Sequence, residues 1–472
     1  MSQVAIKEIR VEGLHEQYDV ALTLNPDLNI IYGRNGRGKT TLLHILANVL
    51  ELDFDRFSNI QFRSIEIATY QGDTLRILPQ VKRIDQPMLL ELNGERLTPL
   101  HHGIGPSELE ISLIRNALGE RAVYLPAFRA ILERSANDAS PSSIERDRYE
   151  EYEGIRVSEN NISREYLIKS HATYDGRVRG GEQHRLTALK TVQCRQWFGE
   201  FVPVIRYPSL VDVRHRLVDE MREATLSTNM FEQRLFSQLF IQVFQAIADE
   251  TQETESKDTE ALLGDVQTAL SAIETKSEGS NDVYGQIRKA VDAVRQSHVA
   301  ETSAVASRIL ALYAELLGRR SHEHELRYSK IRDFEASVNL FLDGKTLSIE
   351  ERFDGGRIRG ASVVSANGRP MTLSALSSGE RQVVTMIFCA SRLSANRGIF
   401  LVDEPELSLH VDWQRSILGE VMRQAKGRQV IACTHSPEVG ADHYDALLEF
   451  DPPPSYAPHD LFGDFDSSVE DI

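Results

Sequence analysis

A glycine-rich stretch near the start of the chain, residues 33–41, has the residue types and spacing of a phosphate-binding loop. Four residues separate Gly33 from Gly38, and Lys39 and Thr40 follow at once. Free backbone N–H groups in such a turn point at phosphate oxygens, and glycines let the backbone wrap closely around them. Lys39 would place its charge on the β- and γ-phosphates of ATP, and the Thr40 hydroxyl would hold Mg²⁺. The candidate nucleotide contacts here are Asn35, Gly36, Gly38, Lys39, Thr40 and Thr41.

Two adjacent carboxylates, Asp403 and Glu404, follow the apolar run 399–402. In an open α/β sheet the carboxyl end of a central parallel strand opens on the ligand crevice. Asp403 can then reach Mg²⁺ directly or through water, and Glu404 is placed to orient and deprotonate an attacking water. The alternative is an ordinary strand that ends in solvated acids; the upstream phosphate-binding loop favours the catalytic interpretation.

Two further stretches contain residues that could bind phosphate. Residues 376–380 precede a helix that starts near Arg381, so Ser377 and Gly379 could form a second anion site at a helix N-terminus. The same residues fit a capping box between Ser377 and Glu380, and the local sequence does not separate the two interpretations. His435 ends another apolar run, 429–434, where a histidine could contact the γ-phosphate, although a lone histidine is more often structural.

Apolar patterns supply the elements that must position these residues. Residues 28–31 read as a buried strand before the glycine-rich turn, and apolar residues from Leu42 to Leu50 recur at helical spacing after it. Other predicted strands share an apolar or alternating pattern: 4–11, 18–24, 60–69, 74–78, 88–92, 123–126, 334–342, 347–353 and 362–364. Those within 60–97 indicate an antiparallel sheet attached to the nucleotide core. The predicted fold class is α/β with a parallel sheet and a large, mainly helical insertion.

The middle of the chain has a different character. Residues 131–163 are polar and predict a loop, and 210–330 are helical in pattern, with an apolar stripe from Phe231 to Phe244 that we expect in a core. The absence of sustained heptads argues against a long coiled-coil arm. Residues 164–195 carry seven Lys or Arg against three acids, which fits a solvated loop or a contact to phosphate or nucleic acid.

Composition limits the class of protein. The 472 residues are 41% hydrophobic and 26% charged, which suits a globular protein of two or three domains. A net charge of −17 argues against broad coating of nucleic acid or anionic membrane. The three cysteines have no C-x-x-C spacing, so neither a disulfide framework nor a zinc site is indicated. We find neither a signal peptide nor an 18-residue apolar run, and expect a cytoplasmic protein without a membrane partner.

The order of these motifs resembles the ABC-type ATPase head of the SMC, Rad50, RecF and OLD group. The resemblance covers about 1–130 and 325–451 and makes Lys39 and Thr40 the Walker A residues and 376–380 the signature motif. It makes Asp403 and Glu404 the Walker B aspartate and the catalytic base, and His435 the switch histidine. The segment 405–410 resembles the D-loop of the OLD-like branch.

Two departures from the family pattern stand out. The signature has Ser378 and Glu380 where transporters usually have Gly and Gln, although Glu is familiar outside the transporters. The strand ending at 124–129 lies where the Q-loop should start, but it carries no glutamine. The resemblance therefore identifies no residue of this chain as the Q-loop glutamine that would contact Mg²⁺.

The resemblance also implies an assembly. ATP would be sandwiched between the Walker residues of one chain and Ser377 and Gly379 of a second, so a homodimer or higher oligomer with composite sites is expected. We predict a slow ATPase with the domains 1–130 (first half of the head), 131–325 (insertion), 326–451 (second half of the head) and 452–472 (acidic tail).

Two functions follow from the resemblance. The size resembles the ATPase components AriA of PARIS and PtuA of Septu, which implies an anti-phage regulator that holds and releases or activates a separate nuclease, under a phage-encoded trigger. Only 37 residues follow His435, too few for a nuclease domain of its own. The alternative is a RecF- or SMC-like DNA repair or maintenance ATPase, which the acidic balance weakens and the basic stretch 164–195 supports. A transporter motor is disfavoured by the signature variant and the large insertion.

Overall fold

The computed structural model describes the chain in seven ranges and five further helical residues. These are 4–79, 88–101, 105–129, 180–248, 304–354, 357–394 and 398–455, with 264, 266–268 and 289. The predicted loop 131–163, residues 164–179 of the basic stretch and the tail beyond 455 lie outside this part of the chain. The chain divides into two compact units, 1–209 with 376–472, and 210–375.

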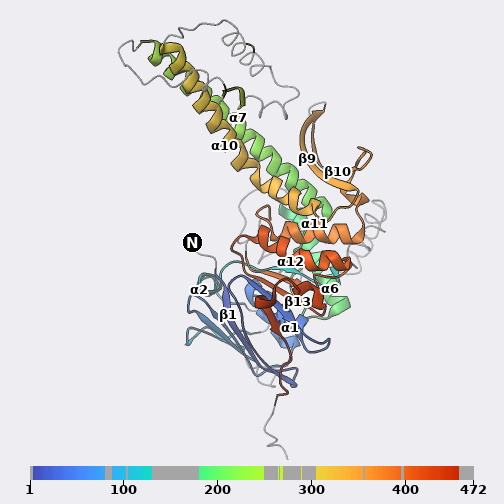
Figure 1. Ribbon diagram of the computed structural model, residues 1–472. Helices are drawn as coiled ribbons and strands as arrows, with labels where there is room; N and C mark the ends of the chain where they lie inside the picture. Colours follow the sequence, from blue (N-terminus) through green and yellow to red (C-terminus); the bar gives the residue numbers. More distant parts are fainter. Residues whose placement is uncertain are drawn as a thin grey trace, which may run out of the picture. The chain divides into compact units, whose positions relative to one another are not determined.

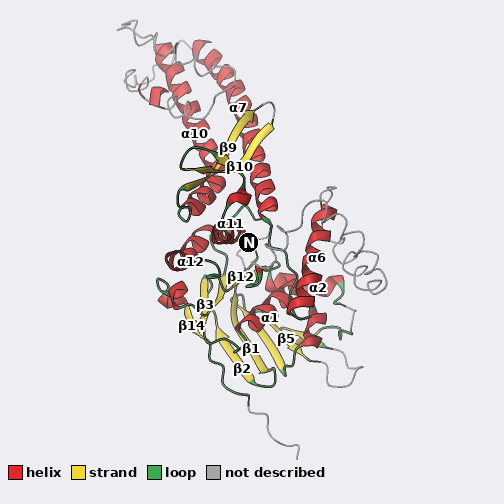
Figure 2. Cartoon of the chain, turned by 90° about the vertical axis from the view of Figure 1, so that its right-hand side faces the viewer, coloured by secondary structure: helices red, strands yellow, loops and turns green. Residues whose placement is uncertain are grey.

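A parallel sheet lies at the centre of the first unit (Figures 1 and 2). Its strand order is β14-β3-β13-β12-β8, and each neighbouring pair is parallel. The inner strands are buried almost throughout, because helices and loops cover both faces of such a sheet. The bounds are β3 Leu28–Tyr32, β8 Val123–Leu125, β12 Phe400–Asp403, β13 Val430–Thr434 and β14 Leu447–Glu449.

An antiparallel sheet with the order β2-β1-β4-β5-β6-β7 completes the β-structure of this unit. Buried and exposed side chains alternate along β1, as expected for a sheet with one covered face. The sheet predicted from residues 60–97 is confirmed, and the two N-terminal strands join it. The bounds are β1 Ile6–Leu14, β2 Tyr18–Thr23, β4 Ser64–Thr69, β5 Thr74–Leu78, β6 Leu89–Leu92 and β7 Glu95–Arg96.

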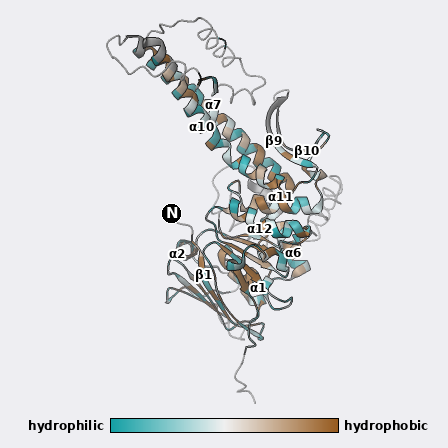
Figure 3. Ribbon diagram, in the orientation of Figure 1, coloured by the Kyte–Doolittle hydropathy of each residue, from teal (hydrophilic) through white to brown (hydrophobic). Residues whose placement is uncertain are grey.

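The helices of the first unit cover the parallel sheet. Helix α1 (Lys39–Glu51) contacts β12 and β13 and is buried over most of its length. Its apolar residues are brown in Figure 3. Helix α11 (Ser378–Ala390) packs on α12 (Val411–Ala425). The other elements are α2 Glu108–Leu118, α6 Gly180–Phe198, and the 3₁₀ turns η1 Phe54–Asn59, η3 Pro437–Gly440 and η4 Tyr444–Ala446.

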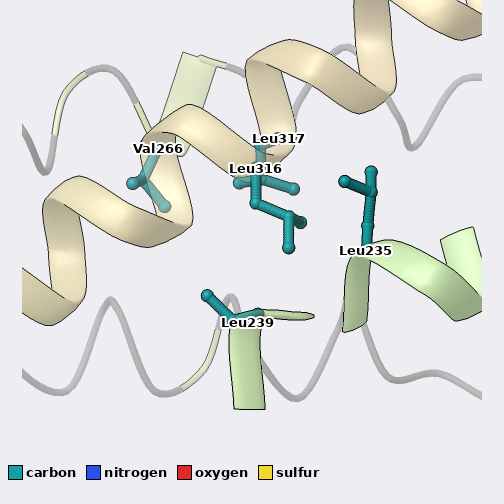
Figure 4. Close-up of a cluster of buried hydrophobic side chains, with 5 residues drawn as sticks. All are labelled: Leu235, Leu239, Val266, Leu316 and Leu317. Atoms are coloured by element: carbon teal, nitrogen blue, oxygen red, sulfur yellow. The ribbon is translucent and has the colours of Figure 1, made fainter. Parts of the chain in front are cut away.

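The second unit contains two long helices, α7 (Leu210–Ala248) and α10 (Ala304–Asn339), packed side by side (Figure 1). Both alternate between teal and brown in Figure 3, as helices with one apolar face do. A cluster of buried side chains joins them: Leu235, Leu239, Val266, Leu316 and Leu317 (Figure 4). The β-elements of this unit are β9 Lys345–Asp354, β10 Arg357–Ser365 and β11 Pro370–Met371, with the 3₁₀ turn η2 Leu373–Ala375.

The predicted fold class, α/β with a parallel sheet, an antiparallel sheet and a large helical region, is confirmed. The predicted strand 334–342 is wrong, because α10 continues to Asn339. Phe334, Val338 and Phe341 are buried at helical spacing. A short apolar run fits a buried helix as well as a buried strand, so the sequence pattern did not separate the two. The expected absence of a long coiled-coil arm stays a prediction; α7 and α10 are long helices that pack against each other.

One other expectation differs from the structure. Phe240 and Phe244, expected in a core, are 66% and 58% exposed in the described part of the chain, so the apolar stripe of α7 is narrower than predicted. The compact units divide the chain after residues 209 and 375, because α6 packs with the first unit and β9 and β10 pack on α7. The predicted domains 1–130, 131–325, 326–451 and 452–472 stay a prediction.

None of the helices in the described ranges is both long enough and apolar enough to cross a membrane.

Candidate functional site

The candidate residues gather at one edge of the parallel sheet. The strands β3, β13, β12 and β8 are neighbours in that order and run the same way, so the loops after their carboxyl ends lie side by side. These loops carry, in the same order, the glycine-rich turn, His435, Glu404 and Arg129. In open α/β sheets this edge is where ligands bind.

The glycine-rich turn adopts the conformation that its sequence predicts. Gly36 and Gly38 have positive φ values of 78° and 97°, in the left-handed region that favours glycine. Gly38 is the N-cap of α1 and no side chain caps this helix, so its first N–H groups are available to an anion. Lys39 is only 7% exposed, and its Nζ donates to the carbonyl oxygens of Gly33 at 2.6 Å and Arg34 at 3.0 Å.

Gly33 has a packing role that the motif alone does not indicate. A Cβ on Gly33 would lie 2.4 Å from the carbonyl oxygen of Phe450, far inside van der Waals contact. Phe450 follows β14, and its N–H donates to Tyr32 at 2.7 Å. The glycine therefore lets the chain after β14 pass directly against the start of the turn.

We expect Gly33→Ala to destabilise the protein by about 1–3 kcal/mol, because the added methyl group forces the two backbones apart. Thermal unfolding measures this as a lowered Tm. Gly419→Ala is the matched control, since its Cβ would meet nothing closer than 3.8 Å and alanine favours the helix interior. Equal Tm values for the two variants would contradict the packing argument.

Thr40 and Asp403 meet although 363 residues separate them. The Thr40 hydroxyl donates to Oδ2 of Asp403 at 2.9 Å. Asp403 is 1% exposed, and burial raises the pKa of its carboxyl to about 6, against the lowering effect of the Thr40 hydrogen bond. A divalent cation would offset this cost of burying the carboxylate. A hydroxyl oxygen beside a buried carboxylate is thus a donor set that fits Mg²⁺.

Glu404 sits directly after β12 in an unusual backbone conformation. Its φ is 46°, which non-glycine residues rarely adopt and which clusters at functional sites. Its N–H donates to the carbonyl oxygen of Cys433 at 2.8 Å, and its side chain is 29% exposed. The carboxylate lies 3.4 Å from Nδ1 of His435, so the predicted base and the predicted switch histidine are neighbours.

Glu406 is a residue of this site that sequence analysis missed, although it lies in the segment that resembles a D-loop. Its Oε1 accepts the Thr434 hydroxyl at 2.6 Å and the N–H groups of His435 at 3.1 Å and Ser436 at 3.2 Å. The same oxygen lies 3.2 Å from Nδ1 of His435. Glu406 is 6% exposed, and its Oε2 has no hydrogen-bond partner among the described residues. One buried carboxylate therefore fixes the whole turn that presents His435.

Replacing Glu406 by alanine removes one acceptor from three donors. We expect Glu406→Ala to lower the turnover number for ATP by about tenfold or more while the Kd for ATP changes little, because a small displacement of a catalytic group is costly. Steady-state hydrolysis and equilibrium ATP binding measure the two effects. Glu406→Gln keeps an acceptor oxygen and is expected to stay closer to wild type. Equal turnover by the two variants would contradict the bracing role.

The signature residues occupy the start of α11. Ser377 is the N-cap, with its Oγ accepting from the Glu380 N–H at 3.3 Å and its own N–H donating to Glu380 at 2.6 Å. The capping box is therefore present, and the anion-binding role of Ser377 stays a prediction. A Cβ on Gly379 would lie 2.6 Å from the carbonyl oxygen of Ser408, so this glycine lets the segment after Glu404 pack on α11.

A comparison with known families bears on this arrangement. Residues 211–442 match the family described as "AAA domain, putative AbiEii toxin, Type IV TA system". That range holds the signature residues, the paired acids and His435, and the strand order brings the glycine-rich turn beside them. 

Over those residues the chain is similar to an AAA-domain family, and its fold is α/β with a parallel sheet at the candidate site.

Similar proteins are known from a bacterium and from archaea. "Retron Ec83 probable ATPase" of Escherichia coli is 33% identical over 88 residues, which are 16% of this chain and 16% of that protein. The Smc head domain bound to the C-terminal domain of ScpA, from Pyrococcus furiosus, has 13% identity and a TM-score of 0.39, covering 93% of this chain and 92% of that one. The Smc head domain with a coiled coil and joint, from Pyrococcus yayanosii, has 13% identity and a TM-score of 0.36, covering 93% of each chain.

Two residues of the first unit, His15 and Tyr18, contact the glycine-rich turn from outside it. His15, in the turn between β1 and β2, has its Nε2 3.4 Å from the Thr41 hydroxyl. The Arg37 guanidinium lies over the Tyr18 ring, 5.7 Å from its centroid. Asn35, predicted as a nucleotide contact, is exposed. The motif gives no signal for His15 or Tyr18, because they reach the turn from the antiparallel sheet.

Two side chains of the basic stretch 164–195 face the head itself. Arg195 is 6% exposed and donates to the carbonyl oxygen of Val202 at 2.9 Å and to Asp53 at 3.1 Å. The Lys190 ammonium lies 5.4 Å from the centroid of the Tyr207 ring. These contacts make both residues part of the packing of α6, rather than a free surface for nucleic acid.

Proposed function

We propose that this protein binds and hydrolyses Mg²⁺-ATP at the carboxyl edge of the parallel sheet. The observation that carries the proposal is the 2.9 Å hydrogen bond between Thr40 and Asp403, which joins a phosphate-binding turn to a buried carboxylate from the far end of the chain. The free N–H groups of the turn and Lys39 would hold the phosphates. Thr40 and Asp403 would hold Mg²⁺, which offsets phosphate charge when bound.

The residues next to Asp403 suit the chemistry of water attack. Glu404 carries a partly exposed carboxylate and would accept the proton of the attacking water. His435, held at 3.4 Å from Glu404, would contact the γ-phosphate and respond to its loss. Turnover is expected to be slow.

We also propose that the active form is a homodimer or a higher oligomer. Ser377 and Gly379 start a helix of their own, at a different strand-to-helix connection from the turn that holds Lys39. In the ABC-type arrangement these two residues of a second copy would close each ATP site. ATP-dependent association of the head would then couple nucleotide state to the helices of the second unit.

For the biological role, we propose a regulatory ATPase of a bacterial anti-phage system. It would act in the cytoplasm, hold a separate nuclease, and release or activate that nuclease when a phage-encoded protein is met. Two comparisons support this role: the description of the matched family names the AbiEii toxin and a Type IV TA system, and a protein similar over 88 residues is named "Retron Ec83 probable ATPase".

Hydrolysis and partnership are tested separately. Purified protein with Mg²⁺-ATP is expected to release phosphate and to show a raised Tm, by linkage of binding to folding. Absence of both would overturn the ATPase proposal. Capture of the tagged protein from its native host, followed by mass spectrometry, is expected to yield a nuclease, for example of the Toprim or HNH class; capture of replication or repair proteins instead would overturn the defence role.

One observation favours a second function, a RecF- or SMC-like ATPase of DNA maintenance. Helices α7 and α10, of 39 and 36 residues, pack against each other and form a long paired helical element. This function predicts that duplex DNA stimulates ATP hydrolysis and that salt weakens the effect. Turnover that does not respond to DNA would exclude it.

A further inference from the structure

Arg129 is completely buried at the edge of the ABC-type head where a Q-loop would start. It follows β8, and its side chain is 0% exposed. The guanidinium donates through Nη1 to the carbonyl oxygens of Pro126 at 2.9 Å and Asp403 at 2.8 Å. It donates through Nη2 to the carbonyl oxygen of Glu404 at 3.0 Å and through Nε to Oε1 of Gln382. One side chain thus joins the loop after β8, the end of β12 and helix α11.

Two of these contacts act on the backbone of the paired acids. Glu404 has a φ of 46°, a conformation that persists only where the surroundings enforce it. On one side its N–H is held by Cys433 at 2.8 Å, and on the other its carbonyl oxygen is held by Arg129. The planar guanidinium can bind the adjacent carbonyls of Asp403 and Glu404 together, which a lysine ammonium does poorly.

The remaining contact reaches the helix that begins at the signature residues. Gln382 lies on α11, within one turn of Gly379, and is 0% exposed. Its Nε2 has no hydrogen-bond partner among the described residues, so its bond to Arg129 is made through Oε1. Gly379 meanwhile packs against the carbonyl oxygen of Ser408. The start of α11 therefore contacts the segment after β12 directly at Ser408, and is linked to Asp403 and Glu404 through Arg129.

We propose that Arg129 is a positioning residue that sets the backbone of Glu404 and ties it to α11 through Gln382. The inference rests on the proposed ATPase function, in which Glu404 is the base. A change at the start of α11, where a second copy's ATP would bind, moves Gln382 and through Arg129 the carbonyls of Asp403 and Glu404. Arg129 contacts neither substrate nor the attacking water; it fixes the position of the Glu404 backbone.

A buried arginine could also serve stability alone, and the head contains a matched control for that role. Arg428 is 4% exposed and likewise donates to backbone carbonyls: those of Gly398 at 2.8 and 3.0 Å, Cys389 at 2.9 Å and Ala390 at 3.0 Å. Cys389 and Ala390 are the last residues of α11, at the opposite end from the signature. Arg428→Met and Arg129→Met therefore remove similar bonds at different ends of one helix.

The two variants are compared by Tm, by the Kd for Mg²⁺-ATP and by kcat. Both are expected to lower Tm. Arg129→Met is expected to lower kcat about 10- to 100-fold with a Kd within about threefold of wild type, since a displacement of about 1 Å costs on that order. Arg428→Met is expected to keep kcat within about threefold. Wild-type kcat in Arg129→Met, or equal losses in both variants, would overturn the inference.

Gln382 provides a test that does not depend on how well Arg129→Met folds. Gln382→Met removes the acceptor for Arg129 and is expected to lower kcat, whereas Gln382→Glu keeps an acceptor and is expected to restore it. In the double variant with Arg129→Met, the two losses are expected to be non-additive, as for residues in one network. Additive losses, or equal kcat in Gln382→Met and Gln382→Glu, would refute the link. If wild type itself releases no phosphate, the ATPase proposal fails instead.

Discussion

Glu404→Gln is expected to bind Mg²⁺-ATP with wild-type affinity and to hydrolyse it about 10²- to 10⁴-fold more slowly, the range that a general base contributes. Glutamine keeps the size and one oxygen of the side chain but cannot take a proton from water. The backbone bonds that hold this residue, to Cys433 and Arg129, do not involve the side chain and survive the change. Phosphate release and equilibrium ATP binding measure the two quantities.

The control for this variant is another acid of the same unit. Glu420 on α12 forms an ion pair with Arg423 at 2.6 Å and takes no part in the sheet edge, so Glu420→Gln is expected to keep wild-type turnover. Wild-type hydrolysis by Glu404→Gln would remove Glu404 from the role of base. A loss of ATP binding in that variant would show instead that the carboxylate supports the nucleotide rather than the water.

Lys39→Ala is expected to weaken ATP binding by roughly 100-fold, with hydrolysis lost as a result. The ammonium is a charge-assisted donor in a mostly buried position, and such bonds are worth about 1.5–3 kcal/mol each. It lies within 3.0 Å of two carbonyl oxygens of the turn, so it is already held where phosphates would arrive. Titration of the protein with ATP, with and without Mg²⁺, measures the loss.

A surface lysine provides the comparison. Lys7 on β1 is exposed, and Lys7→Ala is expected to leave the Kd for ATP unchanged. If Lys39→Ala binds ATP as wild type does, the glycine-rich turn is not the phosphate site. The Tm of Lys39→Ala without nucleotide separates a binding effect from a folding effect, because removal of Lys39 also frees the carbonyls of Gly33 and Arg34.

Local sequence was sufficient to predict the candidate site residues. Glycines with positive φ, a lysine and a threonine at fixed spacing, and acids at the end of an apolar run are patterns within a few neighbouring residues. The strands of the parallel sheet could also be predicted, because strands buried on both faces are apolar without interruption. The error at 334–342 arose where a buried helix and a buried strand share an apolar run.

The residues that hold the candidate site residues in place could not be predicted from local sequence. Gly33 meets Phe450, and Gly379 meets Ser408, only because the chain returns to them after long excursions. Glu406 differs from a solvated acid in its three donors, which come from the last residue of β13 and the turn after it. Arg129 follows a strand that lacks the expected glutamine, and its partners Gln382, Asp403 and Glu404 lie more than 250 residues away.

By itself, the sequence determined which side chains could bind phosphate, hold a cation and activate water, because those properties belong to residue types at short spacing. The tertiary structure decided that they meet, since Thr40 and Asp403 are brought within 2.9 Å by the order of four parallel strands. It also decided how they are held. The left-handed backbone of Glu404 and its hydrogen bond from the buried Arg129 guanidinium depend on contacts between distant segments, which no local pattern encodes.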